Sequence, residues 1–158
     1  YDCEVIVRAG SCGAYAPDLQ LKEVIVADSC YSESTYAKTY SGYEGDIVYP
    51  NDELCEQLYQ SALQHQACCR KGRIHTSDCF YYRKKEDLHD LCDVKGCLGV
   101  DMESFALLHN AQTAGKKAAV LLTVSDHPQQ KLKLSSDERE RSFDEMILIA
   151  LDVLVRYA

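Results

Sequence analysis

The stretch Ala118-Ala119-Val120-Leu121-Leu122-Thr123-Val124 decides the fold, together with the polar residues Ser125-Asp126-His127 that follow it. An uninterrupted apolar run rich in β-forming residues is typical of a strand buried on both faces. Such strands belong to sheets that carry helices on both sides. In these folds ligands bind beyond the carboxyl ends of the strands, so residues 125–127 are the first candidates for chemistry.

Strand and helix patterns alternate along the rest of the chain. Apolar, β-branched stretches predict strands at 4–7, 24–27, 72–75 and 97–102. Apolar residues at helical spacing predict helices over 51–66, 85–94, 105–113 and from 135 onwards, whereas 29–45 is expected to be irregular. The alternation indicates an α/β fold with a layered sheet, and residues 1–158 are expected to form a single domain.

Capping signals mark two of the helix starts. Asn51 or Asp52 can cap the first helix, and Ser135 has a glutamate three residues later, which is the capping-box spacing. The last helix is expected to face the core through one wide apolar stripe, formed by Phe143, Met146, Ile147, Ala150, Leu151 and Leu154.

Composition limits the classes of partner. The 158 residues include 17 Lys and Arg against 25 Asp and Glu, a formal net charge of −8. An acidic chain without a basic cluster lacks the charge that binds nucleic acid or anionic lipid, and no apolar stretch is long enough to span a bilayer. A globular protein without nucleic-acid or membrane partners is therefore expected. The composition is still compatible with a small anion bound in a local pocket.

The cysteines indicate a reducing compartment. There are nine of them, an odd number, and they form no C-x-x-C pair that would suggest a metal site. No secretory signal pattern is present, so a cytoplasmic location is expected. The chain starts without Met and almost directly with a strand pattern, which suggests that it begins inside a larger fold.

The first candidate site segment is Arg8-Ala9-Gly10-Ser11-Cys12-Gly13. A guanidinium, a hydroxyl and a glycine-rich backbone could point into one concavity and hold an oxyanion such as phosphate. The alternative interpretation is a strand that ends at Arg8, followed by a glycine turn with an exposed arginine.

The second candidate segment is Asp101-Met102-Glu103. Carboxylates two residues apart in extended backbone lean to one side, and a carboxylate is a good acceptor for a vicinal diol. Alternatively, Glu103 sits in the first turn of the following helix, where its charge suits the helix dipole.

The third candidate is Asp126, because a carboxyl group directly after a buried strand can act as a proton donor. Ser125 precedes it, His127 is taken as structural, and Arg139 is either solvated or reaches back to Asp126. Phe80 belongs to an aromatic cluster that either stacks on a flat base or fills the core.

Five motifs, in this order, carry a resemblance to a known family: R-A-G-S-C-G-A from Arg8, S-D-C-F-Y-Y from Ser77, G-V-D-M-E-S from Gly99, T-V-S-D-H from Thr123 and D-E-R-E-R-S-F from Asp137. Together they resemble the hexameric, bacterial-type purine nucleoside phosphorylases over essentially the whole chain. The resemblance implies a three-layer α/β/α sandwich around a mixed sheet that lacks about the N-terminal third of the family fold. It also implies reversible phosphorolysis of purine (deoxy)ribonucleosides to the base and (deoxy)ribose 1-phosphate.

The resemblance also implies roles for individual residues. Arg8, Ala9, Gly10 and Ser11 are expected to bind phosphate, and Asp101, Met102 and Glu103 the nucleoside, with Glu103 accepting from the ribose hydroxyls. Phe80 and Ser125 are expected beside the base, Asp126 is the expected proton donor to purine N7, and Arg139 promotes that step. Asp101 departs from the glutamate that the family usually carries.

The resemblance implies no metal and no cofactor, inorganic phosphate being a co-substrate, and self-association as a trimer of dimers. Three functions remain open on the sequence. The first is the phosphorylase, the second a phosphate-independent nucleosidase of the same superfamily, and the third a truncated nucleoside-binding protein without activity.

Overall fold

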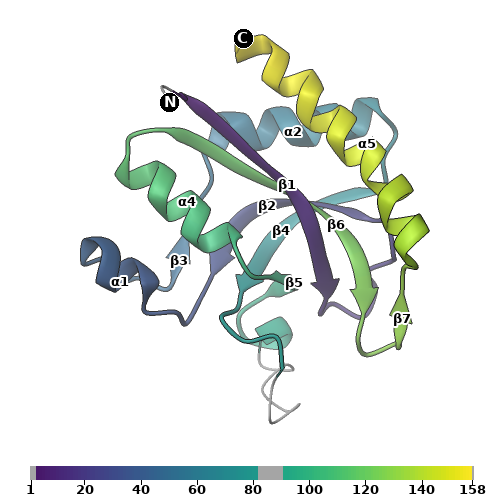
Figure 1. Cartoon of the computed structure of the whole chain (residues 1–158), viewed down its shortest axis with the longest axis horizontal. Helices are drawn as coiled ribbons and strands as arrows, with labels where there is room; N and C mark the ends of the chain where they lie inside the picture. The colour runs from purple at the N-terminus through teal and green to yellow at the C-terminus, as the bar shows by residue number, and fades with distance from the viewer. Residues whose placement is uncertain (1–2, 82–90, 158) are drawn as a thin grey trace.

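One mixed sheet runs through the part of the chain that the computed structural model describes, residues 3–81 and 91–157 (Figure 1). Its strands lie in the order β3-β2-β4-β5-β1-β6-β7, and β2 also pairs with β6. The strands are β1 (Val5–Ala14), β2 (Val24–Tyr31), β3 (Ile47–Val48), β4 (Cys69–Thr76), β5 (Cys97–Asp101), β6 (Lys117–His127) and β7 (Leu132–Lys133). The helices are α1 (Tyr36–Ser41), α2 (Asp52–Gln64), α4 (Ser104–Thr113) and α5 (Ser136–Leu154), followed by the 3₁₀ turn η1 (Val155–Tyr157).

The central strand β6 shows why helices cover both faces of the sheet. Its side chains alternate between the faces, and both sets are buried. Ala119 and Leu121 belong to the core cluster under α2 and α5, whereas Val120 and Leu122 pack with Phe105 of α4 on the other face. The expected α/β/α sandwich with a mixed sheet is confirmed.

The two helix starts that carry capping signals form as predicted. The Asn51 side chain accepts a hydrogen bond from the Leu54 backbone N–H at 3.0 Å. Ser135 and Glu138 form a reciprocal capping box at the start of α5. These bonds satisfy backbone groups that would otherwise lack partners in the first turn.

Strand β1 is longer than the sequence predicted, and the prediction of a glycine turn after Arg8 was wrong. The strand continues to Ala14 because it pairs in parallel with β6 along almost its whole length, from Val5 to Gly13. Gly13 serves close packing rather than a turn, since an added Cβ would lie 2.7 Å from the Asp126 carboxylate.

Of two other predictions, one needs correction and one lies mostly outside the described residues. The segment 29–45 is not irregular throughout, because β2 extends to Tyr31 and α1 follows it. Most of the helix predicted over 85–94 lies outside the described residues.

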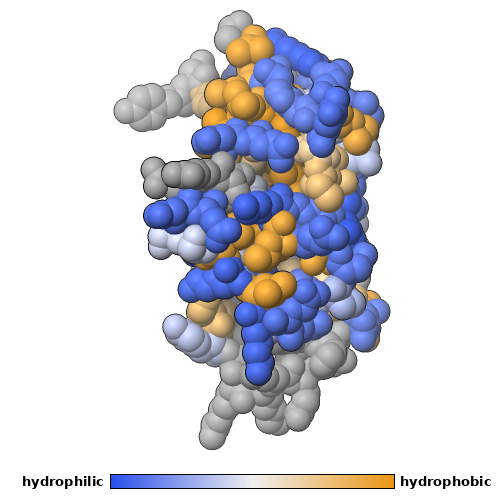
Figure 2. Space-filling view, turned by 90° about the vertical axis from the view of Figure 1, so that its right-hand side faces the viewer, coloured by the Kyte–Doolittle hydropathy of each residue, from blue (hydrophilic) through white to orange (hydrophobic). Residues whose placement is uncertain are grey.

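The predicted core stripe of α5 was wrong in part. The helix buries Met146, Ile149, Ala150 and Val153, whereas Ile147 and Leu151 are exposed together with Leu148. Figure 2, which views the molecule from the right-hand side of Figure 1, shows patches of apolar surface among polar side chains.

Candidate active site

Strand β1 lies between the two strands that carry the predicted acidic residues. Gly13 of β1 is paired with Val100 of β5 on one side and with Asp126 of β6 on the other. Neighbouring strands are about 4.8 Å apart, so the ends of β5 and β6 flank β1 at a mutual distance of about 10 Å. The three candidate segments therefore meet at one end of the sheet, which lies at the bottom of Figure 1.

Arg8 connects the first two segments. Its Nε donates to Asp101 Oδ2 at 3.2 Å, and its Nη2 donates to Glu103 Oε2. The predicted phosphate-binding arginine is thus brought together with the predicted nucleoside-binding carboxylates across more than ninety residues of sequence. The Glu103 side chain is 59% exposed and reachable from solvent, whereas that of Asp101 is only 1% exposed.

Arg8 and Ser11 do not share a concavity formed by a loop. They are three positions apart in an extended strand, so their side chains leave β1 on opposite faces. Both side chains flank the same edge of strand β1. The ladder with β5 covers Gly13 and Ala14, so within the described residues the preceding part of this β1 edge has no ladder partner.

Asp126 lies against strand β1 and faces α5. Ser125 donates through its hydroxyl to Asp126 Oδ1 at 3.3 Å, and Arg139 Nη2 lies 4.0 Å from the same oxygen. Arg139 sits in the first turn of α5, where its backbone N–H donates to the Ser135 carbonyl. The structure therefore brings Arg139 back to Asp126, which the sequence left open. The Asp126 side chain is 33% exposed, so this carboxyl is only partly buried.

The buried thiol of Cys12 shows that these charges surround one point. Burial raises the pKa of Cys12 well above its ordinary value, and the negative charges of Asp101 and Asp126 raise it further. The positive charge of Arg8 acts in the opposite direction. Cys12 is therefore an inert, protonated residue between the candidate site residues.

Phe80 and Met102 lie at the outside of this region. Phe80 is 72% exposed and meets Tyr81 edge to face, with ring centroids 5.0 Å apart. Its segment is tied to the end of β5, because the Ser77 backbone N–H donates to the Asp101 carbonyl at 3.0 Å. An open aromatic face and an exposed thioether next to the acidic residues can contact an apolar, flat ligand.

His127 is buried and takes no part in this arrangement. It follows Asp126 in the strand, so its side chain points to the opposite face. Its Nδ1 accepts from the Gln130 backbone N–H at 3.4 Å. This placement agrees with a structural residue.

Thr76 and Ser104 contact the site and were not singled out from the sequence. Thr76 ends β4, directly beside Asp101 in the parallel ladder, and its hydroxyl donates to Asp101 Oδ1 at 2.8 Å. The Ser104 backbone N–H donates to Asp101 Oδ2 at 3.1 Å. A polar residue at the carboxyl end of a further predicted strand was the available signal for Thr76.

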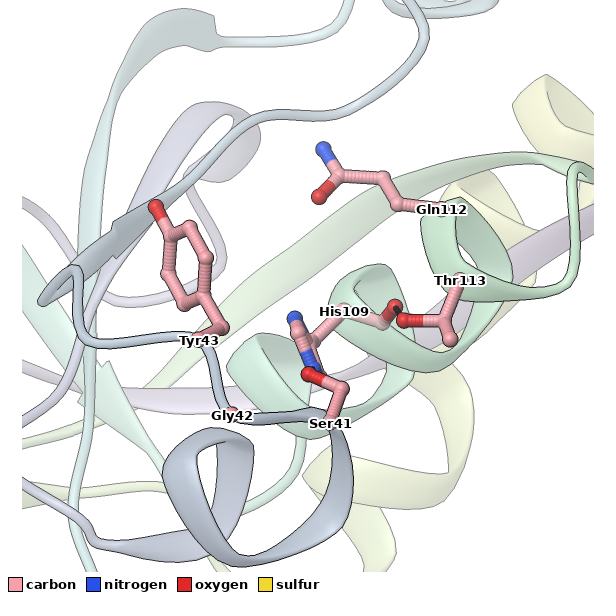
Figure 3. A pocket seen from close by; sticks show the side chains of 6 residues that line it. All are labelled: Ser41, Gly42, Tyr43, His109, Gln112 and Thr113. Carbon is pink, nitrogen blue, oxygen red and sulfur yellow. Dashed lines mark hydrogen bonds between the residues drawn. The ribbon is translucent and has the colours of Figure 1, made fainter.

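A separate hollow of about 380 Å³ lies between the end of α1 and α4 (Figure 3). It is lined by Ser41, Gly42, Tyr43, His109, Gln112 and Thr113, none of which belongs to the predicted site. Its polar groups bond to one another or to backbone: Ser41 Oγ lies 2.8 Å from His109 Nε2, and Gln112 donates to the Tyr49 carbonyl at 2.7 Å. The hollow therefore offers few free groups to a ligand.

The described part of the chain contains neither a metal cluster nor a membrane-spanning helix. Over residues 3–81 and 91–157, no group of three or more His, Cys, Asp and Glu side chains is arranged to hold a metal ion. Within the same ranges, no helix combines the length and apolar character that crossing a membrane requires.

Comparisons with known proteins agree with the motifs. A family model described as the phosphorylase superfamily matches residues 1–157. Among curated proteins, the chain is 39% identical over 155 residues to a DeoD-type purine nucleoside phosphorylase of Mycoplasma genitalium, covering 97% of this chain and 65% of that protein. DeoD-type enzymes of Psychromonas ingrahamii and Brevibacillus brevis are each 36% identical, and the alignments cover 98% and 96% of this chain and 65% and 64% of the relatives.

The chain thus spans about two thirds of the length of the curated relatives that it matches. Its match to the family model runs from its first residue to the penultimate one. Together with the mixed sheet and its two helical layers, these findings show that the chain belongs to the phosphorylase superfamily.

Proposed function

We propose that this chain catalyses the reversible phosphorolysis of purine (deoxy)ribonucleosides to the free base and (deoxy)ribose 1-phosphate. The observation that carries the proposal is that strand β1 has the Arg8–Glu103 pair on the β5 side and Asp126 beside Gly13 on the β6 side. An arginine, a reachable carboxylate and a second carboxylate beside an arginine are the groups that this reaction requires. The names of the similar proteins, DeoD-type purine nucleoside phosphorylases, support the same reaction.

Phosphate would bind at the free edge of β1. Consecutive N–H groups of an extended strand point to opposite edges, so one of the two N–H groups of Ala9 and Gly10 faces this edge, with the guanidinium of Arg8 on one face of the strand and the hydroxyl of Ser11 on the other. A guanidinium and backbone N–H groups bind an oxyanion well, since all of them donate. Binding in this place would orient phosphate for attack on C1′ of the sugar.

The ribose would bind at Glu103 and Met102, just beyond the end of β5. The exposed carboxylate of Glu103 accepts from the vicinal hydroxyls, and this contact strengthens as the sugar acquires oxocarbenium character. Phe80 and Ser125 would lie beside the base, with the exposed ring of Phe80 against its flat face.

Asp126 would donate a proton to purine N7 as the glycosidic bond breaks. A purine anion is a poor leaving group, and a positioned general acid typically contributes about 10²- to 10⁴-fold to such a step. Arg139, 4.0 Å from Asp126 Oδ1, would stabilise the carboxylate that remains after the transfer. This arrangement needs no cofactor, and inorganic phosphate is a co-substrate.

We also propose that the protein self-associates, with a hexamer built as a trimer of dimers as the assembly that the family resemblance implies. Sedimentation velocity of the purified chain measures the assembly directly. A monomer at all concentrations contradicts this part of the proposal and leaves the site chemistry unaffected.

The test of the reaction is base release from inosine and adenosine, followed spectrophotometrically with and without added phosphate. The proposed function predicts release that depends on phosphate. Release at the same rate in phosphate-free buffer identifies a nucleosidase instead. Nucleoside-induced thermal stabilisation without any release identifies a binding protein.

A further inference from the structure

Asp101 is the most completely bonded carboxylate of the site. Its side chain is 1% exposed, and it accepts from groups on three elements. Oδ1 accepts from the Thr76 hydroxyl, at 2.8 Å. Oδ2 accepts from Arg8 Nε at 3.2 Å, from the Ser104 backbone N–H at 3.1 Å and from the Ser104 hydroxyl. A carboxylate offers about four acceptor positions, and four donor groups converge on this one.

The direction of the Thr76 bond is fixed by its neighbours. The Phe105 backbone N–H donates to Thr76 Oγ1 at 3.0 Å, so the hydroxyl oxygen already serves as an acceptor. Its single proton then points to Asp101 Oδ1. The position of Asp101 is therefore set by β4 and by the N-terminus of α4, whose dipole also favours the negative charge.

The fixed position of Asp101 determines the orientation of the Arg8 guanidinium. Asp101 holds the Nε side of the guanidinium, and the remaining N–H groups are directed away from the buried carboxylate towards the exposed side chain of Glu103. A buried charge is tolerated only when it is paired, so loss of Asp101 would release Arg8 from one fixed orientation.

We infer that Asp101, with Thr76, is a positioning residue for Arg8 rather than a contact of the nucleoside. This inference rests on the proposed function, because it assigns to Arg8 the binding of phosphate. It replaces the nucleoside-binding role that the family resemblance implied for Asp101. Its effect is on the affinity for phosphate, while the affinity for the nucleoside is left to Glu103 and the residues beside the base.

The experiment compares Asp101→Asn with Asp101→Glu, and Thr76→Val with Thr76→Ser, in the full chain. The KM values for phosphate and for inosine are measured separately, and phosphate binding is measured by titration calorimetry. We expect Asp101→Asn to raise the phosphate KM about tenfold, the loss expected for one charge-assisted hydrogen bond, with the inosine KM within about twofold. Asp101→Glu, which keeps the charge, restores most of the phosphate affinity.

The two variants of Thr76 keep the test decisive if the Asp101→Asn protein does not fold. Thr76→Val removes one bond to Asp101 and should raise the phosphate KM about threefold, whereas Thr76→Ser keeps the hydroxyl and should not. A rise in the inosine KM alone, with phosphate binding unchanged, overturns the positioning role. A wild-type chain that neither binds phosphate nor consumes it overturns the proposed function itself.

Discussion

Replacing Gly13 by alanine tests how closely β1 and Asp126 are fitted together. The added Cβ would lie 2.7 Å from Asp126 Oδ2, whereas ordinary van der Waals contact begins at 3.4 Å. The carboxylate must therefore move by about 0.7 Å. It has room to do so, because a third of the Asp126 side chain is exposed.

The expected effect is larger on catalysis than on stability. A misplacement of about 1 Å in a reacting group costs up to about 100-fold in rate, so a loss of about 10- to 100-fold in kcat/KM is expected for Gly13→Ala. This corresponds to about 1.4 to 2.7 kcal/mol of transition-state stabilisation. Because the displaced group can swing towards solvent, the free energy of unfolding should fall by only about 1 kcal/mol, the lower end for overpacking.

The assay is phosphorolysis of inosine, together with urea unfolding and a crystal structure of the variant. Gly42→Ala is the matched control, since Gly42 has φ of 78° at the end of α1 with nothing within 4 Å of an added Cβ. That variant should lose about 1 kcal/mol of stability through backbone strain and keep its activity. A folded Gly13→Ala protein with wild-type kcat/KM, or an unmoved Asp126, would refute the reasoning.

Four further predictions concern single side chains. Asp126→Asn should lower kcat about 10²- to 10⁴-fold in a steady-state assay while nucleoside binding measured by calorimetry persists, and unchanged turnover would remove this residue as the acid. Ser135→Ala should lower the free energy of unfolding by about 1 kcal/mol in urea, because it removes the capping box of α5. The Ser135 backbone N–H and hydroxyl hold the pKa of Glu138 below its usual value of 4.5, so the contribution of this carboxylate is present above that pH and is lost as the pH falls through the lowered value. The stability difference between wild type and Glu138→Gln should accordingly vanish in acid-unfolding curves at low pH, and a difference that persists there would contradict the assignment. Burial keeps the pKa of Cys12 far above the assay pH, so iodoacetamide at pH 8 should modify the exposed Cys3 and leave Cys12 intact by mass spectrometry.

Local signals in the sequence were sufficient to predict the central strand and two helix starts. The apolar run that forms β6 predicted a doubly buried strand, and the strand is buried on both faces. Asn51 and Ser135 predicted helix starts because capping is settled within one turn of the chain.

The errors arose where distant strands decide the local structure. Gly10 and Gly13 were interpreted as a turn, but pairing with β6, more than a hundred residues away, keeps them extended. The outer side chains of α5, such as Ile147 and Leu151, are as apolar as the inner ones, so periodicity did not identify the face that packs on the sheet.

The candidate site was predictable as a set of residues and not as a set of contacts. Residue type and position at strand ends were enough to select Arg8, Glu103 and Asp126. That Arg8 pairs with two carboxylates, and that Thr76 supports one of them, follows from the order of β4, β5 and β1 in the sheet. Strand order depends on contacts between segments that no local pattern records.

The most direct test of the central claim is a ³¹P NMR time course of the chain with inosine and inorganic phosphate. The account predicts that the phosphate signal falls while a sugar phosphate ester signal rises in proportion to the base released. Base released without any ester signal would show hydrolysis, and a folded chain that changes neither signal would show that it does not catalyse phosphorolysis.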